Sequence, residues 1–361
     1  MPMPNIGKIL IIQLGDIGDV IWTTPTLWAV KRAYAHARVS ILVREGYGVL
    51  IEGDPSLDKV FEVPRYKGGL LRQGRNQIRF LRALRQEGFS MVIDLRAGDR
   101  GAILAYLTGA PMRVSQHYDR GVPFWRKRLF THIIYPPATT EKVRGAAEQS
   151  LRIVRGLGIE SRDPIPRLWI SAEADKRVQE ILQNERMAEC GNWITLNPFA
   201  RWAYKEWNLE RWAEIIDWLQ DEYLIPTVII GAPEERERAA ALVKKCRSAV
   251  FNLAGKTPLR ELPGLLRLSL LHIGVDSAAP HIAAAVGTPT ITLYGPTDWY
   301  DWAPIGERHR VIVPDQECVP CQKKGCRDEG RSQCLDELKP EKVQAVIQQS
   351  LNQLSIRQSF T

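Results

Sequence analysis

The stretch that most clearly indicates the fold class is D-S-A-A-P-H-I-A-A-A-V-G-T-P-T-I-T-L-Y-G-P-T-D-W-Y, which spans Asp276 to Tyr300. The apolar run Leu271 to Val275 before it is expected to be a buried strand, and the Ala-rich segment a helix. A Gly-Thr-Pro turn follows, and the β-branched run Thr290 to Leu293 is expected to be the next strand. This order predicts a strand–helix–strand unit of an α/β fold with parallel sheets.

The polar turn at the start of this helix suits an anionic ligand. Asp276 and Ser277 can cap the helix, whose first-turn N–H groups attract a phosphate, and His281 is close to that turn. The turn from Tyr294 to Thr297 follows the second strand, at the carboxyl end where open α/β sheets bind ligands. Taken alone, the unit could equally be an ordinary crossover.

A second unit of this kind lies near the N-terminus. The apolar strand expected at Lys8 to Gln13 is followed by L-G-D-I-G-D-V-I-W-T-T-P-T-L. Gly15 and Gly18 allow a tight turn and close approach of a ligand, and Asp16 and Asp19 place carboxylates where the strand gives way to a helix. Each aspartate could instead be a simple turn or N-cap residue.

Together these segments resemble glycosyltransferase family 9, the bacterial ADP-heptose:lipopolysaccharide heptosyltransferases. Three intervening motifs follow in the family's order: N-P-F-A-R-W-A-Y-K-E-W-N-L-E-R-W from Asn197, I-G-A-P-E-E-R-E-R from Ile230, and N-L-A-G-K-T-P-L-R-E-L from Asn252. The resemblance implies the GT-B architecture, in which two Rossmann-like domains with parallel sheets face each other across a cleft. It also implies that the donor is held mainly by the second domain and the acceptor mainly by the first.

Length and composition agree with two domains. A chain of 361 residues with 45% apolar content can bury two ordinary cores. The segment Gly156 to Glu185 breaks the periodicity, so we expect an acceptor-binding domain at 1–170, an ADP-sugar-binding domain at 186–340, and a C-terminal helix and tail at 341–361.

Strands and helices are expected to alternate in both halves. The expected strands are Lys8–Gln13, Val39–Val43, Val60–Val63, Met91–Asp94, Ile194–Asn197, Thr227–Ile230, Val250–Asn252, Leu271–Val275 and Thr290–Leu293. Helices are expected near Thr26–Tyr34, Arg72–Glu87 and Lys142–Gly156, and from about Leu209, Glu234, Pro258 and Ala278.

Inverting glycosyl transfer needs a base for the acceptor hydroxyl and positive groups for the departing diphosphate. The resemblance makes Asp19, in its Gly-Asp-Val context, the catalytic base. It places Lys205, in a Lys-x-Trp motif, against the pyrophosphate or the leaving oxygen. The alternatives are an N-cap role for Asp19 and an ordinary surface position for Lys205.

The resemblance also implies a set of donor-binding residues. Asp276, Ser277, Ala278 and His281 match the family's donor-binding turn, although the family's frequent Thr-Gly pair is Ser277-Ala278 here. Glu235 matches a position that holds the ribose hydroxyls, and Thr257 one that contacts the adenine. A first-turn carboxylate that only favours the helix dipole is the alternative role of Glu235 and its neighbour Glu234.

Basic residues are concentrated in the first half of the chain. Arginines recur from Arg72 to Arg85, and such a surface favours an anionic partner. The acceptor implied by the resemblance, a Kdo-bearing phosphorylated lipid A core, is polyanionic, and Arg65, Lys67 and Arg120 are the candidate acceptor-binding residues. A merely solvated helix face is the alternative. No nucleic-acid-binding module is recognisable, so no nucleic-acid partner is expected.

Four of the six cysteines form a C-x2-C-x4-C-x7-C pattern: Cys318, Cys321, Cys326 and Cys334. Four thiolates could hold a structural zinc ion or an iron–sulfur cluster, but the spacing is not that of a standard zinc finger. Reduced or disulfide-paired cysteines are the alternative. No catalytic metal or other cofactor is expected, because basic residues can neutralise the leaving group.

These observations predict an inverting glycosyltransferase that moves heptose from ADP-L-glycero-D-manno-heptose to the lipopolysaccharide inner core. A non-catalytic nucleotide- or polyanion-binding protein of the same fold, or a transferase using another nucleotide sugar, is the alternative. The sequence has no apolar run of about 20 residues and no signal-peptide pattern at Met1 to Gly7. We therefore expect a cytoplasmic protein, peripheral to the inner face of the inner membrane.

Overall fold

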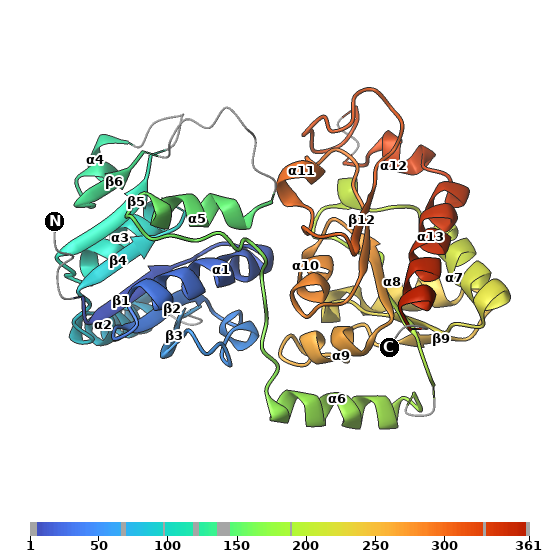
Figure 1. Cartoon of the computed structure of the whole chain (residues 1–361), viewed down its shortest axis with the longest axis horizontal. Helices are drawn as coiled ribbons and strands as arrows, with labels where there is room; N and C mark the ends of the chain where they lie inside the picture. Colours follow the sequence, from blue (N-terminus) through green and yellow to red (C-terminus); the bar gives the residue numbers. More distant parts are fainter. Residues whose placement is uncertain are drawn as a thin grey trace. The chain divides into compact units, whose positions relative to one another are not determined.

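The computed structural model describes residues 6–65, 70–96, 98–117, 123–135, 145–187, 190–327 and 330–358. The chain divides into two compact units, Met1–Trp169 and Ile170–Thr361. Each unit is built round a six-stranded sheet whose neighbouring strands are all parallel (Figure 1). The predicted α/β class with two Rossmann-like domains is confirmed.

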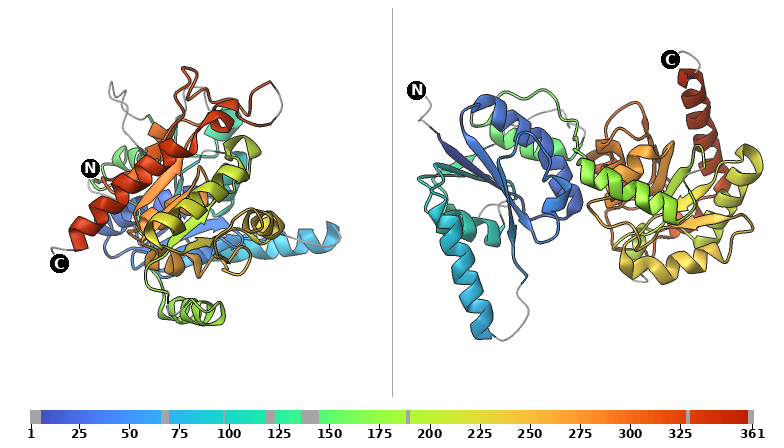
Figure 2. Two further views of the ribbon diagram at one scale, coloured as in Figure 1. Left: turned by 90° about the vertical axis from the view of Figure 1, so that its right-hand side faces the viewer. Right: turned by 90° about the horizontal axis from the view of Figure 1, so that it is seen from below.

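The first unit has the strand order β3-β2-β1-β4-β5-β6. Its strands are β1 (Lys8–Ile12), β2 (Arg38–Arg44), β3 (Lys59–Val63), β4 (Met91–Asp94), β5 (Met112–Gln116) and β6 (His132–Ile134). Its helices are α1 (Ile17–Ala33), η1 (Gly48–Leu50), α2 (Leu70–Gln86), α3 (Asp99–Leu107), α4 (Phe124–Lys127) and α5 (Ala147–Arg155). Helices α1 and α5 pack together on one face of the sheet, and α2 lies on the other (Figure 2).

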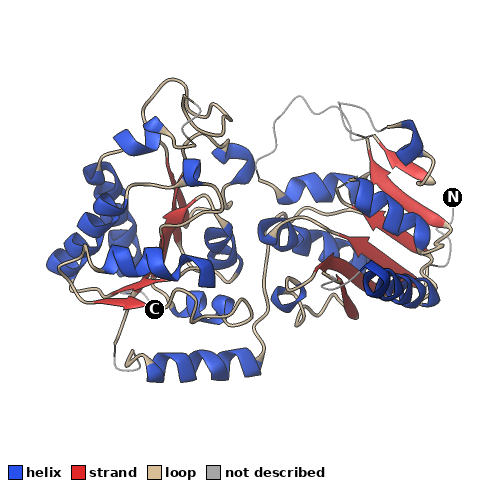
Figure 3. Ribbon diagram, turned by 180° about the vertical axis from the view of Figure 1, so that it is seen from behind, coloured by secondary structure: helices blue, strands red, loops and turns tan. Residues whose placement is uncertain are grey.

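The second unit repeats this arrangement, with the order β12-β11-β10-β7-β8-β9. Its strands are β7 (Ile194–Asn197), β8 (Thr227–Ile229), β9 (Val250–Asn252), β10 (Leu271–Val275), β11 (Thr290–Leu293) and β12 (His309–Ile312). Its helices are α6 (Ala172–Asn184), η2 (Ala203–Lys205), α7 (Leu209–Tyr223), η3 (Pro233–Glu235), α8 (Arg236–Val243), α9 (Leu262–Leu268), α10 (Ala278–Ala285), α11 (Trp299–Trp302), α12 (Gln333–Glu337) and α13 (Pro340–Gln358). Figure 3 shows the helices packed outside the strands of each unit.

The point where the strand order reverses lies at equivalent places in the two units. In the first unit β1 pairs with β4, with Ile12 opposite Asp94. In the second unit β7 pairs with β10, with Asn197 opposite Gly274. Loops leave the two strands of such a pair in opposite directions across the sheet, which opens a crevice at their carboxyl ends. Each unit therefore has one expected ligand-binding edge.

The core of the second unit extends into the C-terminal helix. Trp207 and Trp212 are fully or almost fully buried and pack edge to face, with ring centroids 4.9 Å apart. Helix α13 packs against α7 (Figure 1), and its buried Val343, Ile347 and Leu351 join the same apolar cluster. The predicted C-terminal helix is thus part of this unit's core.

The predicted strands are all present, within one or two residues at their ends. The elements β5, β6, β12, α3, α4, α11 and α12 were not predicted from the sequence, and α6 lies in the segment expected to break the periodicity. Helix α1 begins at Ile17 rather than near Thr26, with Pro25 inside it, and α9 begins at Leu262 rather than near Pro258. In M-R-V-S-Q of β5 polar residues interrupt the apolar pattern, which hides the strand.

We predict that Ile347→Ala lowers the free energy of unfolding of the second unit by about 2–5 kcal/mol, because it leaves a cavity in the core between α13 and the sheet. Denaturant unfolding followed by tryptophan fluorescence measures the change. The exposed neighbour Gln348→Ala is the control and is expected to have little effect. Equal stability of both variants would show that α13 does not support the core.

Candidate functional site

Asp19 lies in the first turn of α1, directly after β1. Its Oδ2 accepts a hydrogen bond from the backbone N–H of Asp16 at 2.8 Å and forms an ion pair with Arg96 Nη1 at 2.6 Å. Arg96 follows β4, the neighbour of β1 in the sheet. The Asp19 carboxylate therefore helps to close the start of the helix, as a capping residue does, and also holds a cation at the ligand-binding edge.

A glycine makes room for this carboxylate. A Cβ atom on Gly15 would lie 2.3 Å from Asp19 Oδ2, closer than atoms can approach. Gly15 therefore allows the Asp19 side chain to fold back over the turn. Gln13 supports the same turn, because its Oε1 accepts the N–H of Gly15 at 3.1 Å and its Nε2 donates to Thr23.

The environment of Asp19 makes it a stronger base than an ordinary aspartate. Burial raises the pKa of Asp19, and the nearby Arg96 guanidinium opposes this rise without cancelling it. The side chain still exposes 22% of its surface. A carboxylate with a raised pKa and an open face is suited to accept a proton from a bound hydroxyl.

The second unit has an ion pair at the equivalent edge. Lys205 Nζ lies 2.6 Å from Asp276 Oδ2, and the two side chains expose 21% and 9% of their surfaces. Lys205 ends η2 in the loop after β7, and Asp276 directly follows β10. The predicted residues Lys205 and Asp276 are thus brought together by the pairing of their strands. The arrangement fixes an ammonium group close to the start of α10.

The helix start itself differs from the prediction in one respect. Ser277 is the N-cap residue of α10, but its side chain makes no capping hydrogen bond, and Asp276 binds Lys205 instead. The Ser277 Oγ is buried without a hydrogen-bond partner, as is the Thr257 Oγ1 in the loop after β9. Buried hydroxyls are rarely left unsatisfied. Both groups are therefore suited to bind a ligand, and Ala278 begins the helix beside Ser277.

His281 cannot serve as a cation for a phosphate at neutral pH. It is buried in α10, and burial lowers its pKa to about 4, with Asp276 opposing and Lys205 reinforcing the shift. His281 is therefore neutral above about pH 5 and can act only as a neutral hydrogen-bonding group.

Glu235 faces its own loop, whereas Glu234 is exposed. Glu235 Oε2 accepts the N–H of Ala232 at 2.7 Å, and burial raises the pKa of this carboxyl. Its position after β8 places it at the same edge of the sheet as Lys205. Glu234 fits the role of an exposed first-turn carboxylate.

The residues that stabilise the loop carrying Lys205 were not predicted from the sequence. Glu206 accepts the N–H of Ala200 at 2.9 Å and forms a two-point ion pair with Arg238 of α8, whose guanidinium lies 4.8 Å from the Phe199 ring centroid. Arg96 was also missed. Only its position directly after a predicted strand could have indicated it.

The cysteine-rich segment contacts two loops at this edge. Gln322 N–H donates to the carbonyl of Pro296 after β11 at 2.7 Å, and Ser332 Oγ donates to the carbonyl of Tyr204, next to Lys205, at 2.6 Å. The four cysteines, all within the described residues, are free thiols, of which Cys318 is exposed and Cys334 is buried. Burial raises the pKa of Cys334 to about 11, and the charges of Cys326, Cys318 and Cys321 add to the rise. In the described part of the chain, no three His, Cys, Asp or Glu residues are grouped as metal ligands.

The predicted acceptor residues are described only in part. Arg65 is exposed, and its backbone N–H donates to Glu45 Oε2 at 2.6 Å. Lys67 and Arg120 lie outside the described residues. Helix α2 carries an exposed basic face, formed by Arg72, Arg75, Arg79, Arg82 and Arg85.

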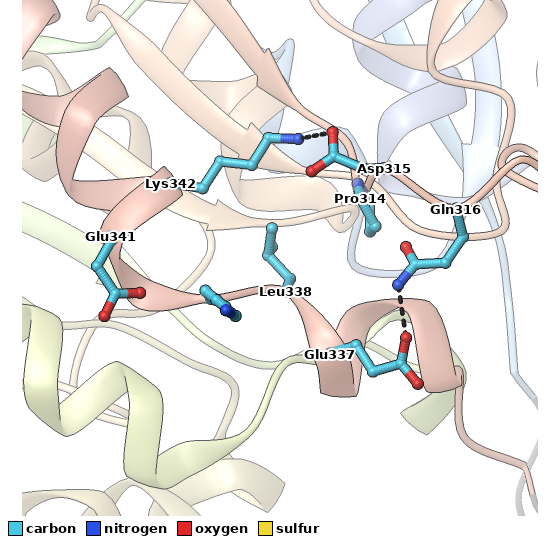
Figure 4. Close-up of a pocket in the computed structure, with 8 residues that line it drawn as sticks. Pro314, Asp315, Gln316, Glu337, Leu338, Glu341 and Lys342 are labelled. Atoms are coloured by element: carbon cyan, nitrogen blue, oxygen red, sulfur yellow. Dashed lines mark hydrogen bonds and ion pairs between the residues drawn. The ribbon is translucent and has the colours of Figure 1, made fainter.

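The second unit has a separate cavity of about 540 Å³ (Figure 4). It is lined by the loop after β12 and the junction of α12 and α13, where Lys342 pairs with Asp315 and Gln316 Nε2 donates to Glu337 at 2.7 Å. It includes neither Lys205 nor Asp276, so we do not assign it to the candidate site.

The model of glycosyltransferase family 9 (heptosyltransferase) matches residues 77–331, which is more than half of the chain. The chain belongs to this family. The glycosyltransferase is 29% identical over 291 residues to lipopolysaccharide heptosyltransferase 3 of Escherichia coli, covering 80% of this chain and 83% of that protein.

Solved structures agree with the fold of the glycosyltransferase. The family 9 glycosyl transferase from Veillonella parvula matches with a TM-score of 0.81 and 22% identity, over 97% of this chain and 99% of that one. The E. coli heptosyltransferase WaaC with ADP matches with a TM-score of 0.73 and 21% identity, over 95% and 99%. In the described part of the glycosyltransferase, no helix is long and apolar enough to cross a membrane.

We predict that Arg96→Met shifts the acidic limb of the pH profile of kcat/KM for glycosyl transfer to higher pH. Arg96 lowers the pKa of Asp19, so its removal raises that pKa further and keeps the carboxylate protonated to a higher pH. The exposed Arg100→Met in α3 is the control and should leave the profile unchanged. An unshifted profile in Arg96→Met would mean that another group controls the acidic limb.

Proposed function

We propose that this glycosyltransferase moves heptose from ADP-L-glycero-D-manno-heptose to the lipopolysaccharide inner core, with inversion at the anomeric carbon. The names of its relatives, lipopolysaccharide heptosyltransferases, support the sugar and the acceptor class, and the ADP-containing structural neighbour supports the nucleotide. The observation that carries the proposal is the partly buried, Arg96-paired Asp19 carboxylate with its raised pKa. A protein that only binds nucleotides has no need of such a base.

In the proposed reaction, the ionised Asp19 carboxylate removes the proton of an acceptor hydroxyl. The hydroxyl oxygen forms a bond to the anomeric carbon as the bond from that carbon to the diphosphate oxygen breaks. ADP leaves with the electron pair of the broken bond. Lys205 stabilises the negative charge that develops on the leaving oxygen, and Asp276 keeps its ammonium group in place.

The second unit is proposed to hold the donor. The N-terminus of α10, with Ser277 and Ala278, would donate hydrogen bonds to the diphosphate. Ser277 Oγ and Thr257 Oγ1 would gain partners from the bound nucleotide, with Thr257 at the adenine. Glu235 would accept hydrogen bonds from the ribose hydroxyls, and the neutral His281 would support the turn.

The first unit is proposed to hold the acceptor. Its exposed arginines, Arg65 among them, favour a phosphorylated lipid core, and Lys67 and Arg120 are proposed to add to this attraction. Such an acceptor is anchored in a membrane by its acyl chains. We therefore propose that the enzyme works in the cytoplasm at the inner face of the inner membrane, without a nucleic-acid partner.

No catalytic metal is needed in this scheme, since Lys205 and the α10 N-terminus supply positive charge for the diphosphate. We propose that Cys318, Cys321, Cys326 and Cys334 bind a structural zinc ion. Four cysteines lie within one segment, and the charges of Cys318, Cys321 and Cys326 add to the raised pKa of Cys334. A bound cation would reverse that effect on the pKa. Binding would require the segment to draw its thiols together.

The function is tested by acceptor-dependent release of ADP from ADP-heptose, with Kdo2-lipid A or a heptosylated core as acceptor. We predict that Asp19→Asn lowers kcat about 10²- to 10⁴-fold, because the amide cannot accept the proton, while ADP still binds. Asp16→Asn is the matched control, since the Asp16 carboxylate is exposed and pairs with Arg44 instead. It should retain most of the activity.

Two results would contradict parts of this proposal. If the native enzyme binds ADP in titration calorimetry but transfers heptose to no acceptor, it uses another nucleotide sugar or has only a binding function. If Asp19→Asn loses ADP binding together with turnover, Asp19 has a structural role rather than that of a base.

The metal proposal is tested by measuring the zinc and iron content of the purified protein. We predict about one zinc per chain in the native protein and a loss of most of it in Cys321→Ser, which removes one of four ligands. Cys190→Ser, outside the segment, is the control. Transfer should persist after brief treatment with a chelator. A metal-free native protein, or equal zinc in both variants, would contradict the proposal.

A further inference from the structure

The first unit exposes an unusual group of large apolar side chains on two short helices. On α4, Phe124 and Trp125 expose 70% and 45% of their surfaces. On α3, Ile103 and Tyr106 expose 44% and 51%. Single exposed apolar residues are common on soluble proteins, but a contiguous group of them marks an interaction surface.

Helices α3 and α4 are neighbours, and an ion pair joins them. Arg126 Nε of α4 lies 2.9 Å from Asp99 Oδ1 in the first turn of α3. Ile103 and Tyr106 follow Asp99 by four and seven residues, so all three share one face of α3. Arg113 lies over the Tyr106 ring, 5.5 Å from its centroid, and its Nε donates to the carbonyl of Leu129 just after α4. The four apolar side chains therefore belong to one surface.

Positive charges surround the exposed rings. Arg126 lies 5.8 Å from the centroid of the Trp125 ring, Arg128 lies 4.4 Å from that of Phe124, and Lys127 between them is exposed. The sequence P-F-W-R-K-R-L-F thus presents two aromatic side chains followed at once by three cations. In Figure 1, α4 lies beside β6, the edge strand of the sheet.

This chemistry matches the surface of an anionic bilayer. Aromatic rings with adjacent cations favour the boundary between headgroups and acyl chains, where the ring enters the apolar layer and the cation stays with the lipid phosphates. A surface for another protein would be expected to lose charge at its centre, whereas here each exposed ring of α4 has its own guanidinium.

We propose that Ile103, Tyr106, Phe124 and Trp125, with Arg126, Lys127 and Arg128, form a docking surface for anionic lipid. This surface would bring the enzyme to the inner membrane, where its acceptor is anchored. The inference therefore rests on the proposed function. Its test measures lipid binding alone, so it can succeed where sugar transfer fails.

The experiment is co-sedimentation of the full-length protein with vesicles of phosphatidylcholine, alone or mixed with phosphatidylglycerol. We expect the native protein to bind the mixed vesicles, with an affinity that falls as salt is raised. The double variant Phe124→Ser/Trp125→Ser should bind about tenfold or more weakly, because the apolar anchor is lost. Lys127→Gln/Arg128→Gln should lose most of the preference for phosphatidylglycerol.

Matched controls come from the second unit. Leu224→Ser removes an apolar side chain that is 77% exposed, and Lys244→Gln removes an exposed cation. Neither substitution should change vesicle binding. Circular dichroism confirms that each variant is folded. The proposal is overturned if the native protein does not bind the mixed vesicles. It is also overturned if the α4 variants bind the mixed vesicles as strongly as the control variants do. It is also overturned if Phe124→Ser/Trp125→Ser changes the oligomeric state without changing lipid binding, which would assign the surface to a second copy of the chain.

Discussion

Parallel pairing between the first and fourth strands of each sheet is the constraint on which the candidate site depends. Hydrogen bonds between β1 and β4 align their carboxyl ends, so the loops that carry Asp19 and Arg96 become neighbours. The pairing of β7 with β10 does the same for Lys205 and Asp276. Residues far apart in the sequence therefore meet as ion pairs because backbone geometry places them together, and the chemistry of the side chains only completes the contact.

The loops at these edges are held in place by contacts with other parts of the protein. Gly15 leaves space for the Asp19 carboxylate, and Gln13 fixes the turn beneath it. Glu206 ties the Lys205 loop to Arg238, and Ser332 ties it to the cysteine-rich segment. Such support matters because a catalytic group must be held within a fraction of an ångström of its working position.

The sequence predicted the parts of this structure that local patterns encode. The strands rich in Val, Ile and Leu were found. The family resemblance pointed to Asp19, Lys205 and Asp276, which the structure places after strands of the two sheets. The polar residues of β5 hid a strand, because they interrupt its apolar pattern. Glu206 and Arg238 could not be predicted, because their importance comes from partners that only the fold brings near. Arg96 could have been indicated only by its position just after a predicted strand. The ion pair of Asp276 with Lys205 depends on the sheet register, since Lys205 follows β7 and Asp276 follows β10.

The two ion pairs also differ in the order of their charges. In the first unit the acid follows the first strand and the cation follows the fourth, whereas in the second unit the cation follows the first strand and the acid follows the fourth. The sheets share one strand order, so this reversal involves only residues in the loops beyond the hydrogen-bonded strands. The same strand arrangement therefore carries ion pairs of opposite charge order at this edge without any change in the backbone that supports them. The first unit thus places a carboxylate after its first strand, and the second unit places an ammonium group there.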